Sequence, residues 1–338
     1  MQERLSAKGL TPPTNQRDAT FDIMKGIGIL LVITCHFFNW NHPLLGRSIN
    51  SFHMPMFFMV AGYFSKSFIS WKEAWTNIKK YARRLLPAFV FTQVFIILWS
   101  VLMALTKDEG WDQVLRQTLS LFWADPHGPY TSWGRLSIGV IWFLVALFVA
   151  KCLLLVISRL ISWSIPLSII LSIGAILLHR LFPYSIWCIS LGLTALPFLT
   201  IGWWARNHKI PGWIIIVCII CWVLAILYSH LVMYDMDWGF FPLDFIGACG
   251  GSFCLYMICK FISKHLRFIS KPLAVLGVWS LAVMCFHDLE MHCHLGNHFM
   301  ALLPISVPGW GQYLFRYIIA IALAAIAVKT PHVKSLFV

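Results

Sequence analysis

Apolar residues fall in long, nearly continuous runs along the chain, not in the short alternating patterns of soluble helices and strands. Each run is about 20 residues long, which matches the ~30 Å hydrocarbon thickness of a bilayer. A single strand leaves its backbone hydrogen bonds unsatisfied in lipid, so each run is expected to be a helix. The runs cover residues 21–38, 50–68, 85–106, 137–158, 161–179, 184–204, 212–232, 241–262, 273–291 and 312–330. The pattern predicts an all-α polytopic membrane protein, a bundle of about ten transmembrane helices.

Short connections join the runs, which indicates one membrane domain over residues 21–330. Segment 1–20 is polar, and the flanking segments 1–20 and 331–338 are expected to be cytoplasmic tails. Two runs contain a proline that is expected to kink the helix, Pro166 in 161–179 and Pro197 in 184–204.

The charged residues of the connections indicate the orientation. Alternate connections are strongly basic, notably after the second run (Lys66, Lys72, Lys79, Lys80, Arg83, Arg84) and after the eighth (Lys260, Lys264, Arg267, Lys271). The intervening connections carry acids instead (Asp235, Asp237, Asp288, Glu290). Basic loops stay in the cytoplasm, so both termini are predicted to be cytoplasmic.

Composition agrees with a membrane protein and argues against a soluble domain or a nucleic-acid-binding protein. The chain of 338 residues is 59% hydrophobic and 12% charged, against about 25% charged in an ordinary soluble domain. Its net charge of +13 is explained by the basic cytoplasmic loops, so membrane lipid is the expected partner and nucleic acid is not. Most of the ten cysteines lie inside apolar runs and behave as small hydrophobes, including the Cys218–Cys221 pair.

Ionisable residues inside the first run need a separate explanation, because such residues are costly in lipid and mark functional sites. The run contains Asp22, Lys25 and His36. Eleven helical residues bring Lys25 and His36 to nearly the same face, about 16 Å apart along the axis. Asp22 and Lys25 have the i, i+3 spacing of an ion pair. A structural alternative is that Lys25 reaches the interface and that His36 forms a hydrogen bond within the core.

Other polar residues are predicted at the depth of His36. His53 begins the second run, His287 ends the ninth and Asp244 begins the eighth, all toward the outer side. Histidine exchanges protons near neutral pH, and a carboxylate beside it can orient the ring. Sharing a depth does not establish that these side chains meet.

Five segments, in order along nearly the whole chain, resemble the membrane-bound acyltransferase-3 family, especially its fucose 4-O-acetylase-like branch. Residues 17–36 resemble the family's opening helix, in which a basic residue, here Lys25, is followed after ten residues by a histidine, here His36. Residues 52–64 read FHMPMFFMVAGYF, similar to the family's FHMPLFFxxSGYF, with Ala61 in place of serine. The remaining matches are residues 80–87, with Lys80 in place of the first arginine of RxxR, then 141–148 and 276–287.

The resemblance implies an enzyme that transfers an acyl group, usually acetyl, from acetyl-coenzyme A to a sugar hydroxyl of a cell-envelope polysaccharide or its lipid-linked precursor. It implies a bacterial inner membrane and no metal. His36 is then the general base or a transient acyl carrier, with His53 and His287 as further catalytic candidates. The expected donor-binding residues are cationic (Lys25, Lys80, Arg83, Arg84). Trp142 and Asp244 are candidates for acceptor binding.

Three alternatives remain open. The helix count and polar residues within the membrane also suit a transporter or flippase of a lipid-linked or small polar substrate. A second alternative is a metal-binding protein, because the segment 287–298 holds possible zinc ligands (His292, Cys293, His294, His298). The third is a structural subunit of an envelope assembly. Separately, the cationic cluster can be a membrane-interface anchor alone.

Overall fold

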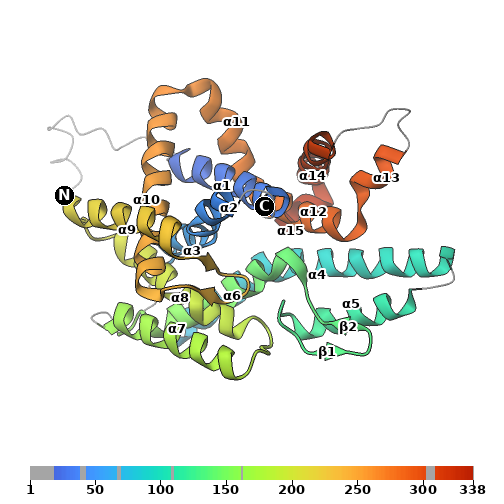
Figure 1. Ribbon diagram of the computed structural model, residues 1–338, viewed down its shortest axis with the longest axis horizontal. Helices are drawn as coiled ribbons and strands as arrows, with labels where there is room; N and C mark the ends of the chain where they lie inside the picture. Colours follow the sequence, from blue (N-terminus) through green and yellow to red (C-terminus); the bar gives the residue numbers. More distant parts are fainter. Residues whose placement is uncertain are drawn as a thin grey trace, which may run out of the picture.

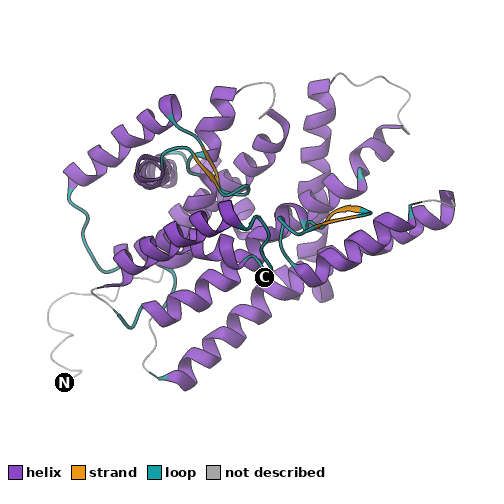
Figure 2. Cartoon of the chain, turned by 60° about the horizontal axis from the view of Figure 1, so that its bottom comes forward, coloured by secondary structure: helices purple, strands orange, loops and turns teal. Residues whose placement is uncertain are grey.

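The protein is almost entirely helical, with two small β-hairpins. The structure is a computed structural model that describes residues 19–38, 43–66, 70–107, 110–160, 163–301 and 309–337. Figure 1 shows helices lying side by side along the whole chain, and Figure 2 shows how little of it is strand. This architecture agrees with the predicted all-α membrane protein.

The first half of the chain holds α1 to α6 and one of the two hairpins. Its elements are α1 (Ala19–Phe38), α2 (Pro43–Asn50), α3 (His53–Tyr63), α4 (Trp71–Lys107), α5 (Trp111–Trp123), the hairpin of β1 (Tyr130–Thr131) and β2 (Gly134–Arg135), the 3₁₀ helix η2 (Gly139–Ile141) and α6 (Trp142–Ile157). Helix α5 runs back along α4 (Figure 1).

The second half packs around the first. Its elements are α7 (Ser164–Leu181), α8 (Ile189–Ala205), α9 (Gly212–Tyr228), the hairpin of β3 (Leu231–Val232) and β4 (Asp237–Trp238), α10 (Phe241–His265), α11 (Arg267–Val278), α12 (Ser280–Cys293), α13 (Leu295–Ala301), α14 (Gly309–Lys329) and α15 (Pro331–Phe337). Both hairpins are antiparallel.

Helix α6 forms the centre of the core. Residues 142–147 are all buried, and the helix packs between α4 and α8. Helix α9 is the opposite case. It is apolar along its length, yet Ala225 is its one buried residue. An apolar helix that leaves its side chains exposed is suited to contact with lipid, so α9 lies at the periphery of the bundle.

Two helix crossings bring backbone against backbone. Helix α1 crosses α11 where Gly26 meets the Leu273 carbonyl, and a Cβ at Gly277 would overlap the Asp22 carbonyl oxygen. The second crossing joins α3 to α8, where Gly62 meets the Leu199 carbonyl. Small residues permit such close packing between membrane helices, which lack a hydrophobic driving force in lipid.

Every predicted run contains a helix, but not every helix is long enough to cross a bilayer. Within the described ranges, six helices are long and apolar enough, and a seventh span results if α11 and α12, bent by 68°, count as one. Helices α8 and α9 are shorter, and α3 has 11 residues, or about 17 Å. The protein is therefore a multi-pass membrane protein, while ten spans and cytoplasmic termini remain predictions.

Several elements differ from the sequence-based expectation. Pro166 lies in the first turn of α7, where a missing N–H costs nothing, so it does not interrupt the helix. Pro197 lies inside α8 as predicted. The connection 107–136 contains the amphipathic helix α5, and the expected tail at 331–338 contains α15, whose Phe337 packs against Phe91 of α4.

Replacing Gly277 by alanine is expected to destabilise the protein. The new methyl group overlaps the Asp22 carbonyl, and relief requires α1 and α11 to separate, at a cost of about 1–3 kcal/mol. The matched control is Gly174→Ala in α7, where a Cβ meets no atom within 4 Å. Melting temperatures of both variants in detergent test this, and equal values would contradict it.

Candidate active site

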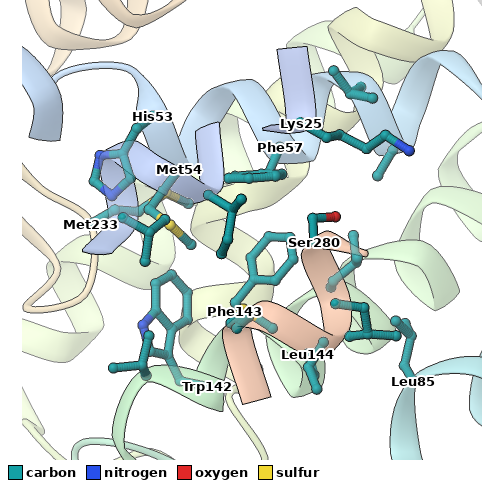
Figure 3. Close-up of a pocket in the computed structure, with 18 of the residues that line it drawn as sticks. Lys25, His53, Met54, Phe57, Leu85, Trp142, Phe143, Leu144, Met233 and Ser280 are labelled. Atoms are coloured by element: carbon teal, nitrogen blue, oxygen red, sulfur yellow. The ribbon is translucent and has the colours of Figure 1, made fainter. Parts of the chain in front are cut away.

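A single cavity of about 1080 Å³ runs between α1, α3, α4, α6, α12 and the β3–β4 hairpin. Figure 3 shows His53, Met233 and Trp142 at one end and Lys25 and Leu85 at the other. Six of the residues expected to form the site line this cavity (Lys25, His36, His53, Lys80, Arg84, Trp142).

One end of the cavity is cationic. Lys25 Nζ lies 2.8 Å from Asp22 Oδ1, which confirms the ion pair expected from their spacing. Lys80 and Arg84 reach the same cavity from α4, one helical turn apart. Because α4 begins at Trp71, the basic cluster lies on the same continuous helix as the apolar segment that follows it.

A fourth basic residue at this end is Lys151 of α6. Its ammonium donates to the Ala61 carbonyl (3.1 Å) and to Ser65 Oγ (2.9 Å), and it lies 4.8 Å from the centre of the Tyr81 ring. These two oxygens take two of the three donors of the ammonium. Lys151 was missed in the sequence, although an ionisable residue within the run 137–158 meets the same criterion as Lys25.

The middle of the cavity is apolar. Its walls come from four helices (Ile29, Val32, Phe57, Phe143, Leu144, Leu147, Met284). In Figure 3, Phe57 and Phe143 lie between the Lys25 end and the His53 end. A ligand that reaches both ends must therefore have a thin, weakly polar central part.

His36 and His287 meet at the other end. Their ring centres are 5.3 Å apart, with 48° between the ring planes. His36 lines the cavity and is exposed to it, whereas His287 is buried behind it on α12 and does not line the cavity. Lys25, Ile29, Val32 and His36 all face the cavity, in agreement with the helical stripe expected for α1.

His53 and Trp142 complete this end. His53 Nδ1 lies 2.8 Å from the Ile49 carbonyl, which fixes the ring, and the residue is buried at the start of α3. Cys35, next to His36, donates to Asn50 Oδ1 (2.9 Å), so the end of α1 is tied to the segment that precedes His53. Trp142 begins α6 and forms part of the wall.

Two expected site residues lie elsewhere. Arg83 is exposed on α4 and does not line the cavity. Asp244 is buried at the start of α10, where Oδ2 accepts hydrogen bonds from Ser229 Oγ and the Phe240 N–H, both at 2.9 Å. Asp244 thus joins the two ends of the β3–β4 hairpin instead of facing the cavity.

A buried carboxylate next to His287 connects α12 to α6. Asp288 Oδ1 accepts a hydrogen bond from the Val140 N–H (2.7 Å) and lies 3.6 Å from His292 Nδ1. Exposed N–H groups at a helix N-terminus favour a negative charge. Asp288 therefore holds the His287 segment against the start of the helix that carries Trp142.

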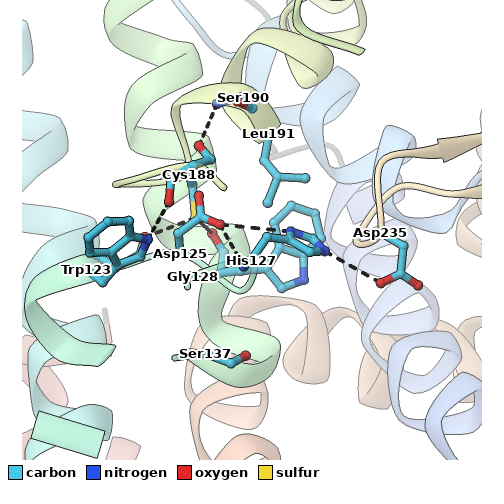
Figure 4. A network of polar contacts seen from close by, with 12 residues as sticks. Trp123, Asp125, His127, Gly128, Ser137, Cys188, Ser190, Leu191 and Asp235 are labelled. Atoms are coloured by element: carbon cyan, nitrogen blue, oxygen red, sulfur yellow. Dashed lines mark hydrogen bonds and ion pairs between the residues drawn. The ribbon is translucent and has the colours of Figure 1, made fainter. Parts of the chain in front are cut away.

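Polar residues outside the apolar runs form a network beside the hairpin (Figure 4). Asp125 is fully buried and accepts a hydrogen bond from the His127 N–H (2.8 Å), and burial raises the pKa of its carboxyl. His127 Nε2 lies 3.6 Å from Asp235 Oδ1, and the His127 ring lies 5.2 Å from that of Tyr234. Burial likewise raises the pKa of the Tyr234 phenol.

The histidine-rich segment 287–298 is spread over separate contacts. His292 pairs with Asp288, Cys293 is buried, and His298 lies against the Trp99 ring. His294 ends α12 with a left-handed backbone, φ 48°. Over the described part of the chain, no three histidine, cysteine or acidic side chains are grouped to hold a metal ion.

Fold and site together define a multi-pass membrane protein whose helices enclose a cavity with cations at one end and histidines at the other. Residues 18–329 match the family described as an acyltransferase domain, the acyltransferase-3 family. The chain belongs to this family. The resemblance stated from the sequence is confirmed at this level, and the fucose 4-O-acetylase-like branch remains a prediction.

One curated protein shares a short similar stretch. Over 88 residues the chain is 36% identical to the nodulation protein NolL of Mesorhizobium japonicum, a match that covers 23% of this chain and 23% of NolL. No solved structure matches the chain significantly.

Asp288→Ala is expected to lower the stability of the protein. The change leaves the buried Val140 N–H without its acceptor, at a cost of about 1–3 kcal/mol. Asp237→Ala removes an exposed contact with His230 and should cost less than about 1 kcal/mol. Thermal unfolding of both purified variants measures the difference, and an unchanged melting temperature for Asp288→Ala would refute the anchoring role.

Proposed function

We propose that the protein transfers an acetyl group from acetyl-coenzyme A to a hydroxyl of a sugar, with His36 as the general base. The observation that carries the proposal is the continuous cavity between the basic residues and His36. A short acyl group on a long carrier suits this shape, because the carrier's charged part and its reactive end must be held far apart.

The basic end suits the phosphates of coenzyme A. Lys80 and Arg84 offer donors to phosphate oxygens, and Lys25 and Lys151 lie at the same end of the cavity. The pantetheine arm is long, thin and weakly polar, as the apolar walls around Phe57 and Phe143 require. Lys25 lies about 16 Å from His36 along α1, so it serves donor binding and not the reacting carbonyl.

The histidine end suits the transfer step. His36 removes the proton from the acceptor hydroxyl as its oxygen attacks the thioester carbonyl. The carbon–sulfur bond then breaks, and the imidazolium returns its proton to the thiolate of coenzyme A. His287, in ring contact with His36, and His53, fixed by Ile49, orient or assist this base. Direct acylation of His36 is the covalent form of the same scheme.

The acceptor is proposed to belong to a cell-envelope polysaccharide or its lipid-linked precursor. This rests on membership of the acyltransferase family and on the multi-pass architecture, which gives access to a lipid-linked substrate. A bacterial inner membrane, with the basic end in the cytoplasm, completes the proposal. The sequence-based alternative is a transporter or flippase of a lipid-linked or small polar substrate.

His36→Ala is expected to abolish acceptor-dependent release of coenzyme A from acetyl-coenzyme A. Loss of a general base lowers the rate by about 10²–10⁴-fold. The assay uses purified protein with a panel of sugar acceptors. The matched control is His208→Ala, because His208 is exposed on the Trp204 ring and does not line the cavity.

The outcomes separate the site from the class of protein. Equal release by the wild type and His36→Ala keeps the enzyme but removes His36 as its base. No release with any acceptor, together with no binding of acetyl-coenzyme A, favours the transporter. Both variants must first match the melting temperature of the wild type.

Lys80→Ala and Arg84→Ala are each expected to raise the KM for acetyl-coenzyme A about tenfold, with a smaller change in kcat. A hydrogen bond to a charged group contributes about 1.5–3 kcal/mol, and exposure reduces this toward the lower value. Lys79→Ala is the control, because Lys79 lies over the Trp75 ring and does not line the cavity. An equal KM in all three variants would contradict donor binding at this end.

A further inference from the structure

The tip of the β3–β4 hairpin forms part of the cavity wall. Residues 232–235 line the cavity, although β3 and β4 belong to a connection between apolar runs. In Figure 3, Met233 lies at the same end as His53 and Trp142. The hairpin therefore places its side chains at the end where the acceptor must bind.

We infer that Asp235 and Tyr234 form an acceptor subsite that binds the hydroxyl groups of an uncharged sugar ring at the histidine end of the cavity. The inference rests on the proposed acetyl transfer to a sugar. In the sequence, Asp235 only marked the membrane orientation, and Tyr234 had no expected role.

Asp235 is held through its backbone, and its side chain lies beside His127. Its N–H donates to the Val232 carbonyl (3.1 Å) within the hairpin turn, and Oδ1 lies 3.6 Å from His127 Nε2 (Figure 4). His127 is itself buried and held by Asp125. The hairpin's base is fastened by Asp244. A carboxylate on an anchored hairpin loses less ordering entropy on binding than one on a mobile loop.

The carboxylate retains capacity for a ligand. The Asp235 side chain is 56% exposed. Its two carboxylate oxygens offer about four acceptor sites, and His127 lies near only one of these oxygens, Oδ1. Adjacent hydroxyl groups of a sugar can donate to both oxygens. A negative charge at this point disfavours an acidic sugar.

Tyr234 supplies the aromatic part of the subsite. Its ring lies between those of His127 (5.2 Å) and Trp142 (6.2 Å), and its hydroxyl bonds to the Ser137 side chain. Tyr234 and Trp142 both line the cavity. An aromatic wall beside a few fixed polar groups is typical of small-molecule sites.

The hairpin offers a matched control. Asp237 has the same chemistry, is 55% exposed and pairs with His230 Nε2 at 3.0 Å, but it does not line the cavity. Asp235→Ala and Asp237→Ala therefore remove similar exposed contacts and differ in access to the cavity. Neither change opens a core cavity, so both variants should fold.

The test measures ligand binding by saturation-transfer NMR in nanodiscs. The probes are methyl glycosides of fucose, rhamnose, glucose and galactose, with methyl glucuronide as the acidic sugar. At least one neutral glycoside should bind the wild type and Asp237→Ala equally and bind Asp235→Ala about tenfold more weakly. Methyl glucuronide should bind the wild type more weakly than methyl glucoside, and Asp235→Ala should lose this preference. Acetyl-coenzyme A should bind all three proteins equally.

Three results would overturn the inference. These are equal glycoside affinity in Asp235→Ala and the wild type, no binding of any glycoside to the wild type, or weaker acetyl-coenzyme A binding in Asp235→Ala. Release of coenzyme A is then measured with the glycoside that binds. Binding through Asp235 without release keeps the subsite and refutes the proposed acetyl transfer.

Discussion

The close approach of α1 to its neighbours is the constraint on which the site depends. Gly26 brings α1 against the backbone of α11, and Gly28 brings it against Met56 and Phe57 of α3. With these two directions occupied, the stripe from Lys25 to His36 is left to face the cavity. A larger residue at Gly26 would meet the Leu273 backbone, so α1 would have to move away from α11 and carry the cation and the imidazole with it.

Putting both groups on one straight helix fixes their separation. The rise of an α-helix sets Lys25 and His36 about 16 Å apart, whatever the neighbouring loops do. Neighbouring helices then add cations at one end, from α4 and α6, and a second imidazole at the other, from α12. The distance between the cationic and histidine ends of the cavity is thus set by α1. The wall of the histidine end comes from α3, α6 and the β3–β4 hairpin, and the hairpin belongs to a connection between apolar runs.

The features that the sequence predicted well are those set by local geometry. The stripe on α1 and the Asp22–Lys25 ion pair follow from helical periodicity alone. The separation of Asp244 from the cavity cannot be predicted in this way, because a residue's depth in the membrane does not determine how its helix is rotated about its axis. Asp244 bonds to the base of the hairpin, whereas Asp235, which the sequence places in a connection, lines the cavity. The short α3 was also missed, because an apolar run shows where a chain avoids water but not where its helix ends.

The placement of the acids bears on the proposed role of His36 as general base. Asp244 is bonded to Ser229 and Phe240, and Asp288 to the start of α6, so among the residues described neither carboxylate contacts the His36 ring. The neighbour in ring contact is another imidazole, His287. A protonated His36 therefore lacks the carboxylate that stabilises the imidazolium in a Ser-His-Asp triad. A charged imidazole in an apolar cavity is costly, which favours rapid return of the proton to the leaving thiolate over a long-lived ion. In the proposed transfer, proton removal and proton return are then best served by one histidine close to both oxygen and sulfur, a role that suits His36 because it lines the cavity.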